Sequence, residues 1–511
     1  MTLSRRQLLA GGAVLVAGAG LASRPTVRRV LDVSVRRAET AVWRTGSTVA
    51  PPPSSVTIVV QPRRILRPIS PLIYGVAHAN PDQLIGLGAR LNRWGGNPNT
   101  RYNWVNGTWN AARDWEFRNY GDDSGKSSPA GTATDRFVQG NQSVGADTVL
   151  TVPAIGWVSS NADKQVQSVG VPSSGGPPLT PGDDAIAGYN PAENQRRTSV
   201  PSLARKNAPF VDAPEGGDGP VYQDEWIHHL VERFGTADAG GVRYYVVDNE
   251  PDLWSSTHTD IHPVHMSYDQ TLSTFLEYAT AIKAVDPAAR VAGPALSGWQ
   301  AYFYSALDRG GDNFRTHADR QAHADVAFLP WWLDRVRRHD EQAGFRTLDT
   351  LDVHYYPQAA NVFSAADDAD TRGLRLRSTR SLWDPTYVDE SWINDCVRLI
   401  PRLREWIDQF YPGTRLAIGE WNWGGEDSMS GGLAVADVLG IFGREGVDMA
   451  NYWTVPPPES PAARAFALYR DFGDQAIATT LEASPDYITA YASCDSATGD
   501  VLLVAINKRW D

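Results

Sequence analysis

The feature that most limits the fold of this 511-residue chain is a rhythm of eight apolar, β-rich runs separated by longer segments. The runs are IYGVAH (73–78), ARLNRWGG (89–96), DTVLTVPAI (147–155), RYYVVDNEP (243–251), ARVAGPAL (289–296), LDTLDVHYYP (348–357), TRLAIGEWN (414–422) and VDMANYW (447–453). Apolar residues at spacings of three and four predict helices over 224–234, 268–285, 324–339, 392–410 and 433–444. Continuously apolar strands alternating with helices are typical of a parallel sheet covered on both faces. Eight such units predict an α/β fold of the closed (β/α)8 TIM-barrel type.

The pattern changes after Trp453, where short strands are predicted over 466–469, 476–481, 487–493 and 501–506. These strands, joined by 56–60, predict an accessory antiparallel β-sandwich formed from both chain ends. We therefore expect N-terminal sandwich strands in 56–70, the catalytic barrel in 71–455 and the C-terminal sandwich portion in 456–511.

The N-terminus has the pattern of a targeting segment. Ser4-Arg5-Arg6-Gln7-Leu8-Leu9 is similar to a twin-arginine signal, and a mildly apolar stretch of about 15 residues follows it, short of the ~20 that a membrane span needs. We expect a signal peptide over 1–22, a linker over 23–55, and secretion by twin-arginine export. An uncleaved anchor is the alternative.

Charge restricts the partners of the rest of the chain. The first 38 residues hold seven Arg and one acid, which leaves 40 basic and 58 acidic residues, a net charge of −18. An acidic body of this kind repels nucleic acid and anionic membranes. The 18 Trp and 19 Tyr are many for this length. They either fill cores or line a groove, where flat aromatic faces stack on sugar rings. A neutral polysaccharide is therefore the expected partner, with no membrane contact in the mature form.

Polar groups follow several of the apolar runs. The fourth run ends in Asn249 and Glu250, the sixth in His354 and Tyr356, and the seventh in Glu420. The carboxyl ends of barrel strands form one catalytic face, so these side chains are expected to converge. Two carboxyl groups there suit glycosidic cleavage, in which one protonates the leaving oxygen and the other attacks the anomeric carbon or activates water.

Each of these residues could instead have a purely structural role. A single Glu at a strand end is more often a surface residue or an ion-pair partner, and only the second Glu reverses that interpretation. His354 alone fits an orienting role or a core histidine equally. The sequence contains no HExxH zinc motif, no phosphate-binding loop and no GxSxG motif, and its only cysteines are Cys396 and Cys494. No cofactor is expected to be required for the chemistry.

The chain resembles glycoside hydrolase family 44 from about residue 56 to residue 508. The matching segments are RWGGNPNTRYNW (93–104), DWEF (114–117), VVDNEPDLW (246–254), LDVHYYPQ (351–358), STRSLWDPTYVDESWI (378–393), FYPGTRLAIGEWNWGG (410–425), SGGLAVADVLGIFGREGVDMANYW (430–453) and FALYRDFG (466–473). The resemblance implies a retaining endo-β-1,4-glucanase or xyloglucanase, with Glu250 as acid/base and Glu420 as nucleophile. It also implies that Trp392 belongs to the substrate cleft, and that the fold carries a structural calcium ion whose ligands the sequence does not identify.

Other substrate-binding candidates come from the strand ends and from the matching segments. They are Arg93, Trp94, Trp383 and Trp453, in addition to Asn249, His354 and Tyr356. The usual Thr-Glu-Tyr-Asn around the nucleophile is Gly-Glu-Trp-Asn (419–422) in this chain, which leaves the fine substrate preference open. Family members usually continue beyond the Ile-Asn-Lys strand (506–508), so we expect a sandwich that is short of strands.

The expected function is that of a secreted, monomeric endo-β-1,4-glucanase acting on cellulose-like glucans or xyloglucan. Two alternatives remain. One is a glycoside hydrolase acting on xylan, mannan or mixed-linkage glucan, and the other is a carbohydrate-binding barrel that has lost catalysis.

Overall fold

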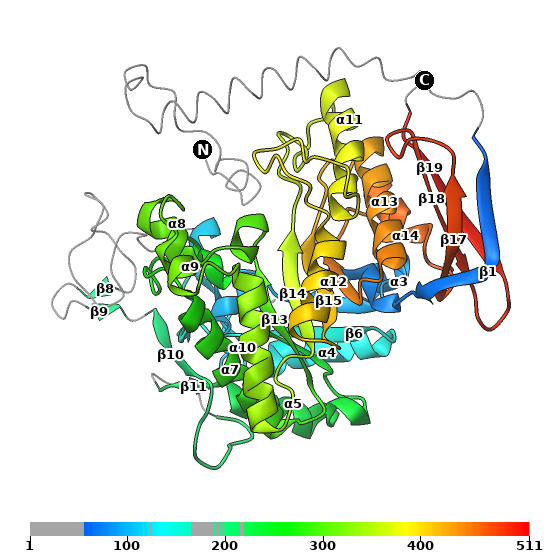
Figure 1. Ribbon diagram of the computed structural model, residues 1–511. Coiled ribbons are helices and arrows are strands. Elements are labelled where there is room, and N and C mark those ends of the chain that lie inside the picture. Colours follow the sequence, from blue (N-terminus) through cyan, green and yellow to red (C-terminus); the bar gives the residue numbers. More distant parts are fainter. Residues whose placement is uncertain are drawn as a thin grey trace.

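The computed structural model describes residues 56–115, 117–122, 125–164, 189–190, 195–196, 198–214 and 219–509. The expected signal peptide (1–22) and linker (23–55) lie outside this part of the chain. Figure 1 shows a barrel with a smaller antiparallel sheet beside it. Within the described residues, each helix falls short of the length and apolar character that a membrane crossing requires.

The predicted barrel is confirmed. Its eight parallel strands close in the order β12-β13-β14-β15-β16-β2-β3-β6. They are β2 (Gly75–Ala77), β3 (Leu91–Trp94), β6 (Asp147–Val152), β12 (Tyr244–Val247), β13 (Arg290–Leu296), β14 (Thr350–Tyr355), β15 (Arg415–Trp421) and β16 (Met449–Tyr452). Each strand falls in one of the eight apolar runs. Side chains from these strands fill the interior as a packed core: Leu91, Val149, Tyr244, Val246, Ala292, Ala295, Ala417 and Met449.

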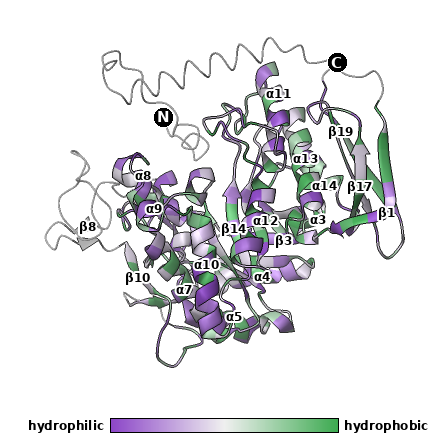
Figure 2. Cartoon of the chain, viewed as in Figure 1, coloured by the Kyte–Doolittle hydropathy of each residue, from purple (hydrophilic) through white to green (hydrophobic). Residues whose placement is uncertain are grey.

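At least one helix follows each barrel strand, and these helices form the outer layer (Figure 1). They are α3 (Pro81–Leu87), α4 (Thr132–Ser143), α5 (Gln223–Phe234), α7 (Tyr268–Val285), α10 (Phe328–Ala343), α12 (Leu399–Phe410), α13 (Met429–Glu445) and α14 (Pro461–Ala467). In Figure 2 helices such as α5 and α10 mix hydrophilic and hydrophobic residues, as amphipathic helices on a barrel do. Additional helices lie in the loops, among them α6 (Trp254–Thr257), α8 (Ala306–Asp312), α9 (Ala318–Ala322) and α11 (Ala369–Ser378).

The helix predicted over 392–410 starts later than expected, at Leu399. The residues before it form local turns instead. Asp389 accepts a hydrogen bond from the backbone N–H of Ser391, and Asp395 accepts one from the backbone N–H of Cys396. Aspartate side chains that bond nearby backbone N–H groups compete with helix formation. Trp392 therefore lies in an irregular segment.

Both chain ends contribute to the accessory sheet, as predicted. It has the order β1-β17-β18-β19, with β1 (Ile58–Pro68), β17 (Gln475–Leu481), β18 (Ile488–Cys494) and β19 (Val501–Asn507), and all its pairings are antiparallel. The strand predicted over 466–469 is wrong, because this stretch overlaps the end of α14. Ser460 caps that helix by accepting from the N–H of Ala463, and Pro461 occupies its first turn, a combination that favours a helix.

The accessory sheet packs on α13, which lies between it and the barrel. The sequence of α13 is apolar on nearly all sides, and most of its residues are buried. Gly440 allows the close approach, because a Cβ atom at this position would lie 2.3 Å from the Tyr491 ring of β18. The sheet is thus held directly on a barrel helix.

Smaller sheets lie among the loops that follow the second and third barrel strands. One contains β7 (Trp157–Ser159), β10 (Ser199–Leu203) and β11 (Val221–Tyr222), and another contains β4 (Trp109–Asn110) and β5 (Asn119–Tyr120). Two strands of two residues each, β8 (Tyr189–Asn190) and β9 (Gln195–Arg196), pair with each other between β7 and β10.

Candidate active site

Glu250 lies just beyond the end of β12, the fourth barrel strand. Its backbone is left-handed, with φ 45° and ψ 57°, a conformation that is uncommon for a residue with a side chain. The Glu250 N–H donates to the Ala295 carbonyl of the neighbouring strand at 3.0 Å. Pro251 then begins a short 3-10 turn. The strand therefore stops at Val247, and the turn holds Glu250 at the carboxyl end of the barrel.

Glu420 belongs to β15, the seventh barrel strand. The pairing of β14 with β15 shifts register immediately before the His354–Glu420 pair, which leaves Gly419 as an extra residue. Such a β-bulge redirects the side chains that follow it. Gly419 is required here, because a Cβ atom on it would lie 2.3 Å from Oδ1 of the buried Asp352.

The two glutamates meet, although 170 positions separate them. One carboxylate oxygen of Glu250, one of Glu420 and a ring nitrogen of His354 all lie within 4.8 Å of one another. Nδ1 of His354 is 3.0 Å from Oε1 of Glu250 and 3.6 Å from Oε2 of Glu420. All three side chains are buried, at 2 % exposure or less. His354 therefore contacts both carboxylates.

Glu420 also accepts two hydrogen bonds, one from a residue of β3 and one from the residue that follows β14. Nη1 of Arg93 donates to its Oε1 at 2.7 Å, and the Tyr356 hydroxyl donates to its Oε2 at 2.8 Å. Nη2 of the same guanidinium donates to Oδ1 of Asn249 at 2.9 Å. A buried carboxylate with a guanidinium and a hydroxyl as donors is stabilised in its ionised form. This suits a nucleophile.

Asp248 has a structural role. Its Oδ1 accepts from the Thr100 hydroxyl at 2.6 Å and from the Asn249 N–H at 2.7 Å, and its Oδ2 accepts from the Ala154 N–H. Burial raises the pKa of the Asp248 carboxyl to about 7, although these bonds act in the opposite direction. Asp248 ties the end of β12 to the loops that follow the second and third strands.

Asp352 is a buried carboxyl group that the sequence analysis did not select. It precedes His354 by two positions on β14, so both side chains point to the same face of the strand. Burial raises the pKa of Asp352, and the nearby Arg93 guanidinium opposes this shift. Its position in the alternation of β14 was the signal that could have identified it.

Aromatic side chains surround Arg93. The Trp453 ring centroid is 5.8 Å from the Arg93 guanidinium carbon, and the His78 ring lies between the Trp453 and Trp94 rings, with centroids 5.8 Å from each. Trp94 also packs on Tyr102. His78 was missed in the sequence, although it directly follows the first barrel strand, a position that predicts the catalytic face.

Trp392 and Trp383 occupy different places. Trp392 is 39 % exposed, and its Nε1 donates to Oε1 of Gln358 at 3.2 Å. Gln358 in turn donates to the Tyr356 carbonyl at 2.9 Å, so Trp392 is linked to the group around Glu420. The Trp383 ring is half-buried beneath the guanidinium of Arg444, 4.3 Å from its centroid, at the last turn of α13. This contact gives Trp383 a packing partner, and its place among the substrate-binding residues stays a prediction.

Within the described part of the chain, one group of three or more His, Cys, Asp or Glu side chains has metal-like spacing, and it is the Glu250–His354–Glu420 group. The Arg93 guanidinium already neutralises Glu420 there, which disfavours a cation at the same position. The ligands of the calcium ion that the resemblance implies therefore remain unassigned.

A parallel (β/α)8 barrel with two close glutamates at the ends of its fourth and seventh strands is the arrangement of a glycoside hydrolase. Comparison with known proteins identifies the family. Residues 108–359 match the model of glycoside hydrolase family 44. Endoglucanase A of Paenibacillus lautus is 34 % identical over 489 residues, which are 90 % of this chain and 64 % of that protein. The chain thus spans less than two thirds of this curated relative.

Solved structures agree with this result. CelM2, described as a bifunctional glucanase-xylanase from a metagenome library, is 38 % identical with a TM-score of 0.77, and the match covers 89 % of this chain and 88 % of that one. A Paenibacillus polymyxa family 44 xyloglucanase, solved with xyloglucan, is 31 % identical with a TM-score of 0.77 and the same coverage of both chains. The chain belongs to glycoside hydrolase family 44.

Proposed function

We propose that this protein is a retaining endo-β-1,4-glucanase that hydrolyses cellulose-like glucans or xyloglucan. The observation that carries the proposal is the distance of at most 4.8 Å between a carboxylate oxygen of Glu250 and one of Glu420. Retaining glycosidases hold their two carboxyl groups about 5–5.5 Å apart, whereas inverting enzymes need roughly 6.5–9.5 Å to admit water. The short separation supports a covalent intermediate.

In the first step the Glu420 carboxylate attacks the anomeric carbon and forms a glycosyl ester, while Glu250 gives its proton to the departing glycosidic oxygen. In the second step Glu250 takes a proton from water, and the resulting oxygen attacks the anomeric carbon and releases Glu420. The same anomeric configuration is restored by the two displacements. Both carboxyl groups return to their starting protonation states.

The neighbouring side chains have distinct roles in this mechanism. Arg93 and Tyr356 hold Glu420 ionised and oriented, because both donate to its carboxylate. His354 lies against Glu250 and fixes the position of its carboxyl group. The Asn249 amide donates one hydrogen to Asn97 at 3.2 Å, and its second hydrogen suits a sugar 2-hydroxyl, a contact that strengthens in the transition state.

The polymer is assigned from the relatives and from the aromatic residues. Relatives are described as an endoglucanase and as a xyloglucanase solved with xyloglucan, and Trp392 and Trp453 offer flat faces for glucose rings. Xylan is a second candidate, because a structure 38 % identical to this chain is described as a glucanase-xylanase. The N-terminal signal pattern supports secretion to the compartment where such polymers occur.

Purified enzyme should be tested on carboxymethyl cellulose, xyloglucan, xylan, mannan and mixed-linkage glucan, with NMR detection of the newly formed reducing ends. We expect hydrolysis of the first two polymers and initial release of the β-anomer. Initial release of the α-anomer would overturn the retaining mechanism. Hydrolysis confined to xylan or mannan would overturn the substrate assignment. Binding of polymers with no cleavage would favour the non-catalytic barrel.

A further inference from the structure

The segment that carries Trp392 has no regular secondary structure of its own. It runs between a 3-10 turn, Thr379–Leu382, and the start of α12 at Leu399. A segment that lacks the regular backbone hydrogen bonds of a helix or sheet depends on side-chain contacts to keep a single conformation. The contacts that hold residues 383–398 therefore determine where the Trp392 ring lies.

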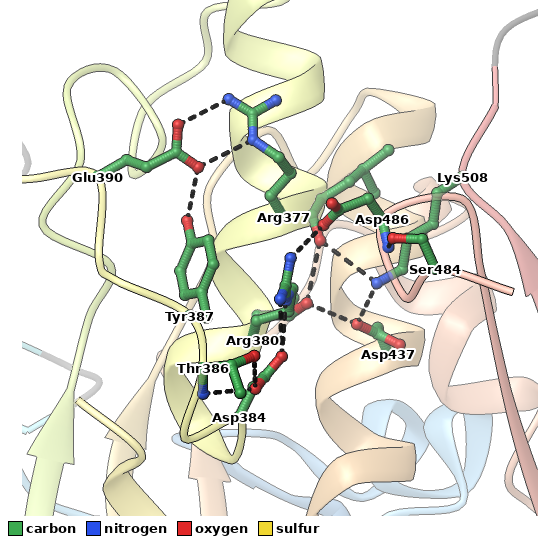
Figure 3. A network of polar contacts seen from close by, with 12 residues as sticks. Arg377, Arg380, Asp384, Thr386, Tyr387, Glu390, Asp437, Ser484, Asp486 and Lys508 are labelled. Carbon is green, nitrogen blue, oxygen red and sulfur yellow. Dashed lines mark hydrogen bonds and ion pairs between the residues drawn. The ribbon is translucent and has the colours of Figure 1, made fainter. Parts of the chain in front are cut away.

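Two arginines on one side of this segment form ion pairs with it, as Figure 3 shows. Arg377, from α11, donates to both carboxylate oxygens of Glu390 at 2.9 and 3.0 Å, and the Tyr387 hydroxyl donates to the same carboxylate at 2.9 Å. Arg380, from the 3-10 turn, donates to Asp384 at 2.9 Å. Glu390 is only two residues from Trp392.

Arg380 is shared with the accessory sheet. Its Nη1 donates to Oδ1 of Asp486 at 2.8 Å, and Asp486 lies between β17 and β18 (Figure 3). The Arg380 side chain is 17 % exposed and its two carboxylate partners are 7 % and 31 % exposed, so the three charges are partly shielded from water. One guanidinium thus joins a strand connection of the sheet to the first part of the Trp392 segment.

The base of the same turn is also attached to the sheet. Thr379 donates to Oδ2 of Asp437 at 2.6 Å, and this oxygen also accepts from Nζ of Lys508 at 2.7 Å. Lys508 directly follows β19. The turn is therefore fixed to the accessory sheet at two points. Arg380, which makes the contact with Asp486, also binds Asp384 of the Trp392 segment.

We propose that Asp486 is a positioning residue for polysaccharide binding: through Arg380 it holds the segment 383–398 so that the Trp392 ring lies in the substrate cleft. This inference rests on the proposed function, because it takes Trp392 as a sugar-stacking residue. The accessory sheet thereby contributes to substrate affinity although it contains none of the residues that contact the catalytic glutamates.

The test is Asp486→Asn, which removes the charge but keeps the shape. A partly exposed ion pair contributes modestly, so we expect KM for carboxymethyl cellulose or xyloglucan to rise about two- to five-fold with kcat unchanged. Asp474→Asn is the matched control, since Asp474 is an exposed aspartate of the same sheet region whose carboxylate accepts from Ser496. Asp486→Glu should restore most of the affinity. An unchanged KM in Asp486→Asn would overturn the proposal.

A double-mutant cycle separates positioning from general loosening of the fold. In a Trp392→Ala background, Asp486→Asn should cause no further rise in KM, because the ring that it positions is absent. If the fold-increases in KM of the two single variants instead multiply in the double variant, the proposal is overturned. Arg380→Lys gives a second route to the same cycle if Asp486→Asn lowers the yield of folded protein. Failure of the wild-type enzyme to cleave any β-1,4-glucan would instead reject the proposed function.

Discussion

Two fully buried ion pairs serve different ends in this molecule. In the barrel mouth Arg93 pairs with Glu420, and in the contact between α13 and the accessory sheet Lys508 pairs with Asp437, each at 2.7 Å. The two carboxylates are equally buried, at 0 % and 1 % exposure. They differ in what else surrounds them.

The Asp437 carboxylate is saturated with donors. Its Oδ1 accepts from the hydroxyls of Thr489 and Tyr491, and its Oδ2 from Thr379 and Lys508. Burial alone would raise the pKa of Asp437, but Lys508 and the hydroxyl donors outweigh it and hold the pKa below its usual value. Every lone-pair direction points at a protein donor, so this pair can stabilise the fold but has no free side for a substrate.

Glu420 accepts from Arg93 through Oε1 and from Tyr356 through Oε2, and it also lies close to a second carboxyl group, that of Glu250. Two carboxyl groups this close repel each other when both are ionised. This repulsion costs stability, a cost that the Asp437 carboxylate does not have. The two ion pairs therefore differ less in burial than in the second carboxyl group that lies beside Glu420.

The largest effect is expected from Glu420→Gln. Removing the nucleophile should lower kcat on xyloglucan or carboxymethyl cellulose by at least about 10³-fold. The unfolding free energy should change much less than in Asp437→Asn, because loss of the Glu250–Glu420 repulsion offsets the unpaired Arg93. Steady-state kinetics and chemical denaturation of the same preparation check both parts. A large loss of stability with substantial remaining kcat would contradict the contrast between the two ion pairs.

Asp437→Asn should have the reverse signature. It leaves Lys508 buried without its counter-charge, and the expected cost is about 3–5 kcal/mol in the unfolding free energy, with kcat per folded molecule retained. Glu405→Gln is the control, because the Arg398–Glu405 pair is largely exposed and its loss should cost about 1 kcal/mol or less. Denaturant titrations would measure the unfolding free energy, and kinetics with active-site titration would measure kcat per folded molecule. A Tm equal to that of the wild type would show that the pair contributes little.

Tyr356→Phe should have an intermediate effect. It removes one donor from the Glu420 carboxylate, and hydrogen bonds to charged groups contribute about 1.5–3 kcal/mol, so kcat/KM should fall by about 10- to 100-fold. Tyr355→Phe is the matched control, because Tyr355 is the adjacent residue and packs on Trp423 instead. Equal losses in the two variants would show that the Tyr356 hydroxyl has no special role.

The smallest effect concerns Asp248 and pH. Its folded pKa of about 7 exceeds the unfolded value of about 3.9, so the native state binds more protons between these two pH values. The contribution of Asp248 to stability is therefore complete below about pH 4 and is lost as the pH rises through 7, at up to about 1.4 kcal/mol per pH unit. Denaturation of the wild type and Asp248→Asn across pH 4–8 measures the difference in slope. If the unfolding free energy fell more steeply with rising pH in Asp248→Asn than in the wild type, the raised pKa of Asp248 would be contradicted.

Sequence reasoning succeeded where a pattern extends over many residues. Eight apolar runs predicted eight barrel strands, and Glu250 and Glu420 were located because they follow or end two of these strands. It failed where local patterns were short. The stretch 466–469 is aromatic enough to suggest a strand but ends a capped helix, and the helix expected from 392 begins at Leu399 because aspartate side chains form turns before it.

The sequence by itself determined the parallel barrel and the two glutamates at its carboxyl end, because strand alternation and strand polarity are properties of local order along the chain. Only the tertiary structure decided which donors surround each carboxylate, that Trp383 packs on Arg444 while Trp392 stays exposed, and that Asp437 and Asp486 fasten the accessory sheet to the barrel. These facts depend on side chains tens to hundreds of positions apart, and their distances follow from packing and register, which local sequence patterns do not encode.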